Sequence, residues 1–167
     1  MDPQTYRAIA TELLAMAQVD QEMRAKAIKD MSQWDASVDQ RNTARIMAIV
    51  GEIGWPTISR VGAAASQSAW LLVQHATAEP EFMKRCLTLM RDAQTGDVAP
   101  ENMAYLEDRI LTMEGKPQIY GTQFRIIDGV IELFPIEDPD HVDQRRARVG
   151  LTTLAEHKAR GKAIYGS

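Results

Sequence analysis

Apolar residues recur every three or four positions along most of the chain, and this spacing predicts amphipathic helices. The first helix follows Asp2-Pro3, an N-cap residue and a proline at the first helical position, and extends to about Met31. Its apolar stripe continues at the same spacing through Asp20, Gln21 and Arg24. Because residues three or four apart share a helix face, we expect these polar side chains on the face that packs inward.

Four more helices are predicted before residue 116. Prolines and glycines mark their ends, because the residue before a proline avoids the α region and glycine suits a helix C-terminus. The expected ranges are about 36–53, closed by Gly54-Trp55-Pro56, then 62–76, then Pro80 to Thr95-Gly96-Asp97, and finally Pro100 to about Gly115.

The spacing then changes to one that is typical of strands. Residues 118–127 and 130–136 flank Asp128-Gly129, a pair that fits a two-residue type I′ hairpin turn. In this register Arg125 lies opposite Glu132, and the opposite charges support the pairing. Ile127 then faces Val130, and Gln123 faces Phe134.

Two short helices are predicted after the hairpin. Asp138-Pro139 is expected to cap the first, which ends near Val149, and Thr153 with Glu156 forms a capping box for the second. The predicted fold class is therefore α+β and mostly α. It is an array of about five main helices with one β-hairpin (about 118–136) and two short C-terminal helices, in a single domain over residues 1–167.

Composition is that of a folded globular protein, with 45% hydrophobic and 25% charged residues. We expect a cytosolic protein with no membrane partner, because no apolar segment follows Met1 and no run approaches about 18 apolar residues. The single cysteine, Cys86, excludes an internal disulfide, and its spacing from apolar neighbours predicts a buried side chain. The formal net charge of −4 makes nucleic-acid binding an unlikely function. It stays an alternative because residues 144–167 are basic and include Arg145, Arg146 and Arg148.

Established catalytic motifs are absent from the sequence. There is no glycine-rich phosphate loop, no G-x-S-x-G, no H-E-x-x-H and no Cys-x-x-Cys. The three histidines also lack the spacing of a paired metal site. We therefore expect neither a cofactor nor a metal.

The strongest candidate for chemistry is His75, which ends the apolar segment Trp70 to Ala76. Histidine is the side chain that most often exchanges protons near neutral pH, so His75 is a candidate acid/base. Gln74 beside it is a candidate for substrate binding. The alternative is a core histidine whose ring is held by a carbonyl or carboxylate.

Two other segments offer partners. Asp108 could orient His75, and Arg109 could hold an anionic group. Gln118, Tyr120 and Gln123, on a strand expected to begin near Gln118, could line a polar pocket for a small-molecule ligand. Asp20 and Arg24 are further candidates, and Asn42 and Arg45 are weaker ones. The alternatives are a structural ion pair for Asp108 and Arg109 and ordinary hairpin-edge chemistry for the strand residues.

Several of these segments occur together in a known family. They are Asp20-Gln21, Gly54-Trp55-Pro56, Trp70 to Ala76, Asp108-Arg109, Gln118 to Gln123 and Pro135-Ile136-Glu137-Asp138. The chain resembles, over most of its length, an uncharacterised family of small bacterial proteins that is classed as a domain of unknown function. The resemblance implies no activity, but it groups the polar residues named above and favours one shared pocket.

The leading hypothesis is a small cytosolic hydrolase or group transferase that acts on a small polar or anionic substrate. His75 would be its acid/base and Asp108 the orienting carboxylate. The rival hypothesis is a non-catalytic binding module in which the same residues form a buried polar network. A third is nucleic-acid contact through the basic C-terminal helices.

Overall fold

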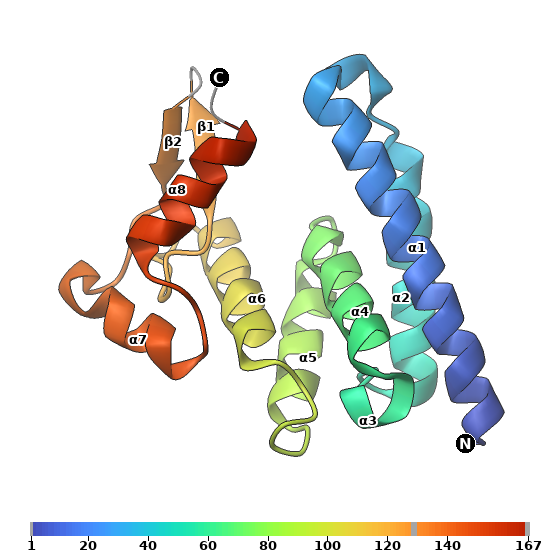
Figure 1. Ribbon diagram of the computed structural model, residues 1–167. Coiled ribbons are helices and arrows are strands. Elements are labelled where there is room, and N and C mark those ends of the chain that lie inside the picture. Colours follow the sequence, from blue (N-terminus) through green and yellow to red (C-terminus); the bar gives the residue numbers. More distant parts are fainter. Residues whose placement is uncertain (1, 128–129, 166–167) are drawn as a thin grey trace. The chain divides into compact units, whose positions relative to one another are not determined.

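The computed structural model describes residues 2–127 and 130–165 and forms two compact units, Met1–Ala99 and Pro100–Ser167. Each unit has its own elements and is described by itself below. The fold class predicted from the sequence, α+β and mostly α, is confirmed (Figure 1). The single domain expected from chain length stays a prediction.

Within residues 2–99, every regular element of the first unit is a helix. The long helix α1 packs against α2 and α4, and α2 also packs against α4 (Figure 1). The elements are α1 (Pro3–Lys29), η1 (Met31–Gln33), α2 (Ala36–Ile53), α3 (Ile58–Val61), α4 (Ala63–His75) and α5 (Pro80–Arg91).

Helix α1 forms as its sequence predicts. The Asp2 side chain accepts hydrogen bonds from the backbone N–H groups of Gln4 and Thr5, which satisfies donors that the first turn leaves without partners. Its buried face consists of Ile9, Leu13, Ala17, Asp20, Met23 and Ala27. Asp20 therefore occupies a core position of the stripe, and it is fully buried.

Helices α2 and α4 match the predicted ranges closely, α5 ends at Arg91 rather than near Thr95, and one helix is added. The single-turn helix α3 precedes α4, and Gly62 separates the two with a φ of 84°, a conformation that glycine adopts without strain. Cys86 in α5 is buried, as expected. Burial raises the pKa of its thiol to about 12.

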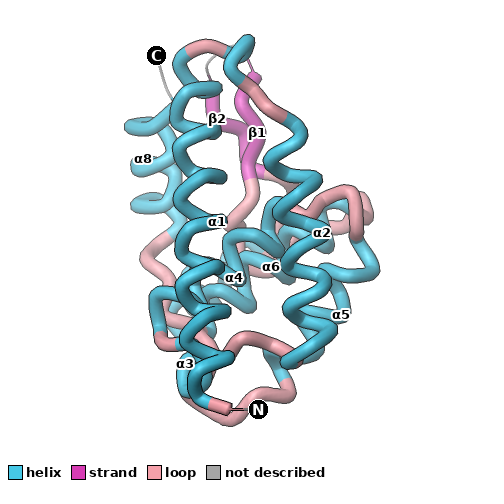
Figure 2. Tube along the Cα trace, turned by 90° about the vertical axis from the view of Figure 1, so that its right-hand side faces the viewer, coloured by secondary structure: helices cyan, strands magenta, loops and turns pink. Residues whose placement is uncertain are grey.

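The second unit combines the helices α6, α7 and α8 with the hairpin, whose strands β1 and β2 are drawn in magenta in Figure 2. The strands pair antiparallel, with Arg125 opposite Glu132 and Ile127 opposite Val130, so the predicted register is confirmed. The predicted turn at Asp128-Gly129 lies outside the described residues. The elements are α6 (Pro100–Met113), β1 (Phe124–Ile127), β2 (Val130–Leu133), η2 (Pro139–His141), α7 (Val142–Arg148) and α8 (Leu154–Tyr165).

The prediction that the first strand begins near Gln118 is wrong. Strand β1 begins at Phe124, and Gln118 itself makes only an isolated parallel bridge with Ile136. Residues 118–123 form a loop because the buried carboxylate of Asp108 draws several backbone N–H groups toward one point. Gly121, with a φ of 68°, supplies the left-handed turn that this path requires.

The start of the helix predicted at Asp138-Pro139 also differs. Asp138 makes no capping hydrogen bond and has a φ of 46°, so a short 3-10 turn precedes α7. Helix α8 begins as predicted, because Thr153 N–H donates to the Glu156 carboxylate and Glu156 N–H donates to the Thr153 hydroxyl.

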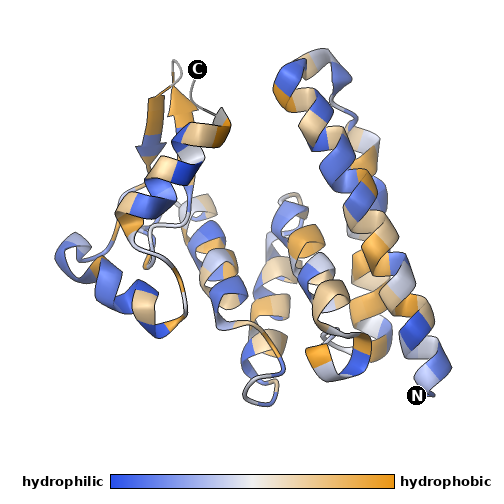
Figure 3. Ribbon diagram, viewed as in Figure 1, coloured by the Kyte–Doolittle hydropathy of each residue, from blue (hydrophilic) through white to orange (hydrophobic). Residues whose placement is uncertain are grey.

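Hydropathy along the ribbon shows apolar and polar faces alternating on α1 and α2, as expected for helices with one buried side (Figure 3). Apolar colour also covers much of the hairpin, where Ile126, Ile127 and Val130 are exposed. Within residues 2–127 and 130–165, no helix has the length and apolar character needed to span a membrane.

Candidate functional site

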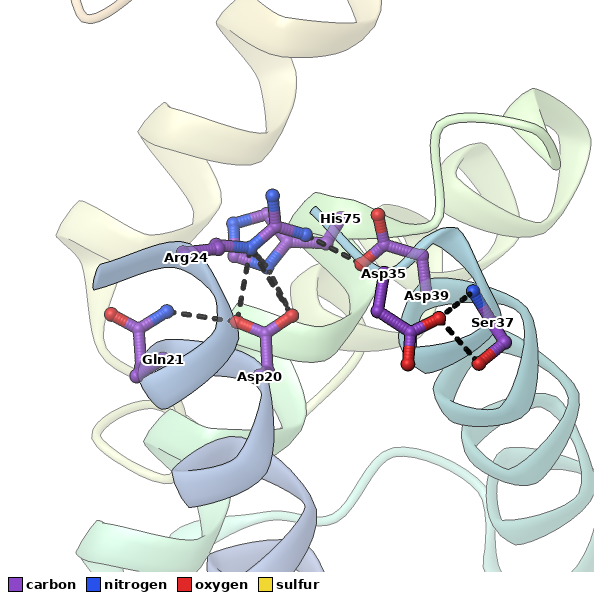
Figure 4. A network of polar contacts seen from close by, with 7 residues as sticks. All are labelled: Asp20, Gln21, Arg24, Asp35, Ser37, Asp39 and His75. Atoms are coloured by element: carbon purple, nitrogen blue, oxygen red, sulfur yellow. Dashed lines mark hydrogen bonds and ion pairs between the residues drawn. The ribbon is translucent and has the colours of Figure 1, made fainter. Parts of the chain in front are cut away.

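The side chain of His75 meets a buried carboxylate in the first unit. His75 is the last residue of α4, and its Nδ1 lies 3.0 Å from Oδ1 of Asp20 on α1 (Figure 4). Asp20 is completely buried, whereas 17% of the His75 side chain is exposed. The helix stripe that predicted a buried Asp20 therefore places it against the ring of the candidate acid/base.

The donors around Asp20 indicate which nitrogen of His75 carries a proton. Arg24 Nε lies 3.2 Å from both oxygens of Asp20, and Gln21 Nε2 lies 2.8 Å from Oδ2. Arg24 Nε also lies 3.1 Å from His75 Nδ1, but a guanidinium N–H and an Nδ1–H would both donate. When Nδ1–H and Arg24 both donate to Asp20, every contact of this buried carboxylate is satisfied, and the approach of Arg24 Nε to Nδ1 is then a contact between two donors that share one acceptor. Nε2, which makes no hydrogen bond within the described part of the chain, is then the basic nitrogen.

Arg24 connects α1 with α2, with α4 and with Trp34, which precedes α2. Its Nη2 donates to Oδ1 of Asp39 on α2 at 2.6 Å, and its guanidinium carbon lies 5.0 Å from the centre of the Trp34 ring. Figure 4 shows the guanidinium between Asp20 and Asp39, beside the His75 ring. A planar cation held by two carboxylates and an aromatic ring loses much of its rotamer freedom, so it fixes the arrangement of α1, α2 and α4 around His75.

The charge state of Asp20 follows from these contacts. Burial alone opposes ionisation, but the hydrogen bond and charge of His75 outweigh it, with further hydrogen bonds from Arg24 and Gln21. Together they lower the pKa of Asp20 from 3.8 to about 2. Asp20 is therefore an anion at neutral pH and can stabilise a positive charge on His75.

A pocket of about 420 Å³ opens beside this network. His75 lines it together with one face of α2 and the connection between α4 and α5. The lining residues are Ala36, Asp39, Gln40, Thr43, Ala44, Met47, His75, Thr77, Ala78 and Glu79. A volume of this size suits a small ligand, so His75 and Asp39 belong to both a polar network and a cavity wall.

Asp108, the predicted orienting residue, has a different set of partners. It is fully buried on α6, and its carboxylate accepts hydrogen bonds from the backbone N–H groups of Ile119, Tyr120 and Thr122 and from the Thr122 hydroxyl. These contacts organise the loop of residues 118–123. The carboxylate that contacts His75 Nδ1 is Asp20.

The other residues predicted from this loop form hydrogen bonds inside the second unit. Gln118 is buried, and its amide bonds the N–H and carbonyl of Gln123 and the carbonyl of Phe134. The Gln123 side chain donates to Thr122 Oγ1. The carbonyl of Tyr120 accepts from Nη1 of the buried Arg146 at 2.6 Å. This loop is therefore held from both sides by buried side chains.

Gln74, Arg109, Asn42 and Arg45 complete the predicted set. Gln74 is buried in α4, and neither polar atom of its side chain has a hydrogen-bond partner in the described part of the chain. Arg109 is half-buried on α6. Asn42 is buried on α2, and Arg45 forms a two-pronged ion pair with Glu12. A pocket that joins residues of both units stays a prediction.

Sequence reasoning missed two groups. Asp39 lies in the first turn of α2, where an acidic residue ordinarily serves the helix itself, and nothing in the local pattern relates it to His75. His157 on α8 is buried, with Nε2 3.0 Å from the carbonyl of Thr122 and Nδ1 3.5 Å from the Tyr105 hydroxyl. Burial lowers the pKa of His157, and the charges of Arg146 and Arg160 add to the effect.

Within residues 2–127 and 130–165, no three His, Cys, Asp or Glu side chains gather closely enough to hold a metal ion. The groups of the His75 site are an imidazole, carboxylates, hydroxyls and an amide, which suit proton transfer and hydrogen bonding.

Comparison with known proteins gives a family and no activity. No curated protein and no solved structure matches the chain. A family described as "Family of unknown function (DUF6624)" matches residues 7–167. Because this match covers nearly the whole sequence, the chain belongs to DUF6624, a family of unknown function.

Proposed function

We propose that the protein is a small hydrolase or group transferase in which His75 acts as the acid/base on a small polar substrate. The observation that carries the proposal is the contact between Asp20 and His75 Nδ1 beside the 420 Å³ pocket. The cytosolic location expected from the sequence belongs to the same proposal.

The geometry gives each residue a role. Asp20 accepts the Nδ1 proton of His75, so the Nε2 lone pair is available to take a proton from water or from a substrate hydroxyl. The buried anion then stabilises the imidazolium until its Nε2 proton passes to the leaving group. Arg24 and Gln21 position Asp20, and the hydroxyls of Thr43 and Thr77 offer hydrogen bonds to the substrate.

The test is an activity screen with matched variants. Purified protein is assayed against p-nitrophenyl acetate, p-nitrophenyl phosphate and a set of small amides, as wild type and as His75→Gln. Loss of a general base is expected to lower turnover by about a hundredfold or more. His141→Gln is the control, because His141 also contacts an aspartate, Asp138, but is exposed and lies outside the pocket. Full activity in His75→Gln would contradict the proposal.

The alternative of a non-catalytic binding module has its own supporting observation. Asp20 accepts hydrogen bonds from Gln21, Arg24 and His75, and a network so fully paired can serve stability alone. In that case His75→Gln lowers the unfolding free energy and no substrate of the screen is turned over.

Nucleic-acid contact through the C-terminal helices has less support from the geometry. Arg146 is buried and Arg145 donates to the backbone carbonyls of Ile119 and Asp138. Two of the three arginines are thereby engaged within the protein, and phosphate contacts need free cationic groups.

A further inference from the structure

We infer that the pocket beside His75 takes a small cationic ligand, one that carries an amine or guanidinium group on a short apolar chain. The inference rests on the proposed function in that it assigns a ligand class to the same pocket. It departs from the polar or anionic substrate expected from the sequence.

The charges of the lining residues carry this inference. Two carboxylates, Asp39 and Glu79, line the pocket, and no lysine or arginine is among the lining residues. Arg24 pairs with Asp39, but it also pairs with the buried Asp20, so the three carboxylates outnumber this one cation. An anionic ligand would therefore meet a net negative charge, whereas a cation would gain charge-assisted hydrogen bonds from Asp39 and Glu79.

The two carboxylates retain free acceptor capacity. Asp39 uses Oδ1 to accept from Arg24, and its Oδ2 accepts no hydrogen bond from the described residues. One quarter of the Asp39 side chain is exposed. Glu79 is exposed and makes no side-chain hydrogen bond within the described part of the chain. Both can therefore turn an oxygen toward a ligand at little cost.

Helix ends do not decide the sign of the favoured charge. Helix α4 ends at His75 and presents its negative end there, while α2 begins at Ala36 and α5 at Pro80 with their positive ends. Two positive ends and one negative end sum to about half a positive charge, which is smaller than the net negative charge of the carboxylates around the pocket.

The remaining wall sets the shape of the ligand. Ala36, Ala44 and Met47 form an apolar surface, and Thr43 and Gln40 add hydrogen-bonding groups. A cationic group on a short alkyl chain matches this combination, because the chain can cover the apolar surface while the charged end keeps a carboxylate partner.

The test compares three probes with the same four-carbon chain: 1,4-diaminobutane, 1,4-butanediol and succinate. Each is titrated into the full-length protein at pH 7, and binding is followed by NMR chemical shifts of the amides of Thr43, His75 and Thr77. We expect diaminobutane to bind and to shift these amides, and succinate to leave them unchanged. Tighter binding of succinate, or no binding of any probe at tens of millimolar, would overturn the inference.

Variants show whether the carboxylates are responsible. Glu79→Gln is expected to weaken diaminobutane binding by about tenfold, the effect of losing one charge-assisted contact. Glu81→Gln is the matched control, because Glu81 carries the same charge on the neighbouring turn but pairs with Lys84 away from the pocket lining. Equal effects of the two variants would mean non-specific attraction and would overturn the inference.

His75→Gln separates this inference from the proposed function. Diaminobutane should still bind to that variant, because the imidazole is assigned to proton transfer and the carboxylates to binding. Retained binding without any enzymatic activity in the wild type would refute the proposed function and leave the ligand class standing. If activity depends on His75 but diaminobutane does not bind, the proposed function stands and the cationic ligand class is refuted.

Discussion

Nδ1 of His75 lies 3.0 Å from Oδ1 of Asp20, although the two residues are 55 positions apart in the chain. The contact joins the end of α4 to a buried position of α1. Since Asp20 is fully buried and also accepts from Arg24 and Gln21, it is the carboxylate that fixes the ring.

Asp20→Asn is expected to destabilise the protein by about 2 kcal/mol. The variant removes the anion that pairs with Arg24 and His75, and both partners are left partly buried. Urea unfolding measures the change. Asp138→Asn, which disrupts the exposed Asp138–His141 pair, is the control and should change stability by less than about 0.5 kcal/mol. Similar effects of both variants would contradict the role given to Asp20.

The contribution of Asp20 should depend on pH in a defined window. Its pKa is lowered from 3.8 to about 2 in the folded protein, so the folded state binds this proton less readily than the unfolded state. The stabilisation is therefore fully present above pH 3.8 and is lost as the pH falls toward 2. The unfolding free energies of wild type and Asp20→Asn, measured from pH 6 to pH 2, should converge at the acid end. A constant difference would argue against an ionised Asp20.

His157 should weaken the second unit in mild acid. Burial and the nearby Arg146 and Arg160 lower its pKa below 6.5, so its neutral form belongs to the folded state. For a histidine whose pKa is lowered on folding, stability is present above the unfolded value and declines as the pH falls below it. Hydrogen exchange at the amides of the loop 118–123, corrected for intrinsic rates, should show lower protection at pH 5 than at pH 7. His157→Gln should abolish this pH dependence.

Asp108→Asn distinguishes a structural role from a catalytic one. One acceptor oxygen becomes an NH₂ group, which leaves a backbone N–H of the loop 118–123 without its partner and costs about 2 kcal/mol. Faster hydrogen exchange at Ile119, Tyr120 and Thr122 should accompany the loss of stability. Unchanged exchange together with lost activity would favour the catalytic role expected from the sequence.

The helices could be predicted because residues close to each end, such as N-caps and prolines, determine where a helix begins. Asp2 caps α1, Pro80 begins α5 and Pro100 begins α6, and each effect extends over only a few residues. The hairpin register was equally local, since a short turn leaves few pairings and Arg125 with Glu132 favours one of them.

The loop 118–123 could not be predicted from its own residues. Its alternating polar side chains are typical of a strand. The carboxylate of Asp108, more than ten residues earlier, instead accepts the backbone N–H groups that strand pairing would need. A buried carboxylate must find donors, and this loop supplies four of them. The hydrogen bonds to Asp108 therefore outweigh the preference of residues 118–123 for a strand.

The candidate site was predicted in part. His75, Asp20 and Arg24 were singled out because they continue apolar stripes, and the structure brings these three together. Their pairing depends on how α1 packs on α4, which helix periodicity does not specify. Asp39 was missed for the same reason, since only the packing of α2 beside α1 brings it to Arg24.

The protonation of the His75 ring decides whether Nε2 can act as the base. ¹⁵N chemical shifts of the two ring nitrogens identify the tautomer at a pH where the ring is neutral. We expect a proton on Nδ1, donated to Asp20, with Nε2 as the free base. A proton on Nε2, with Nδ1 accepting from Arg24 Nε at 3.1 Å, would contradict it, because the nitrogen assigned to proton transfer would then have no lone pair to offer.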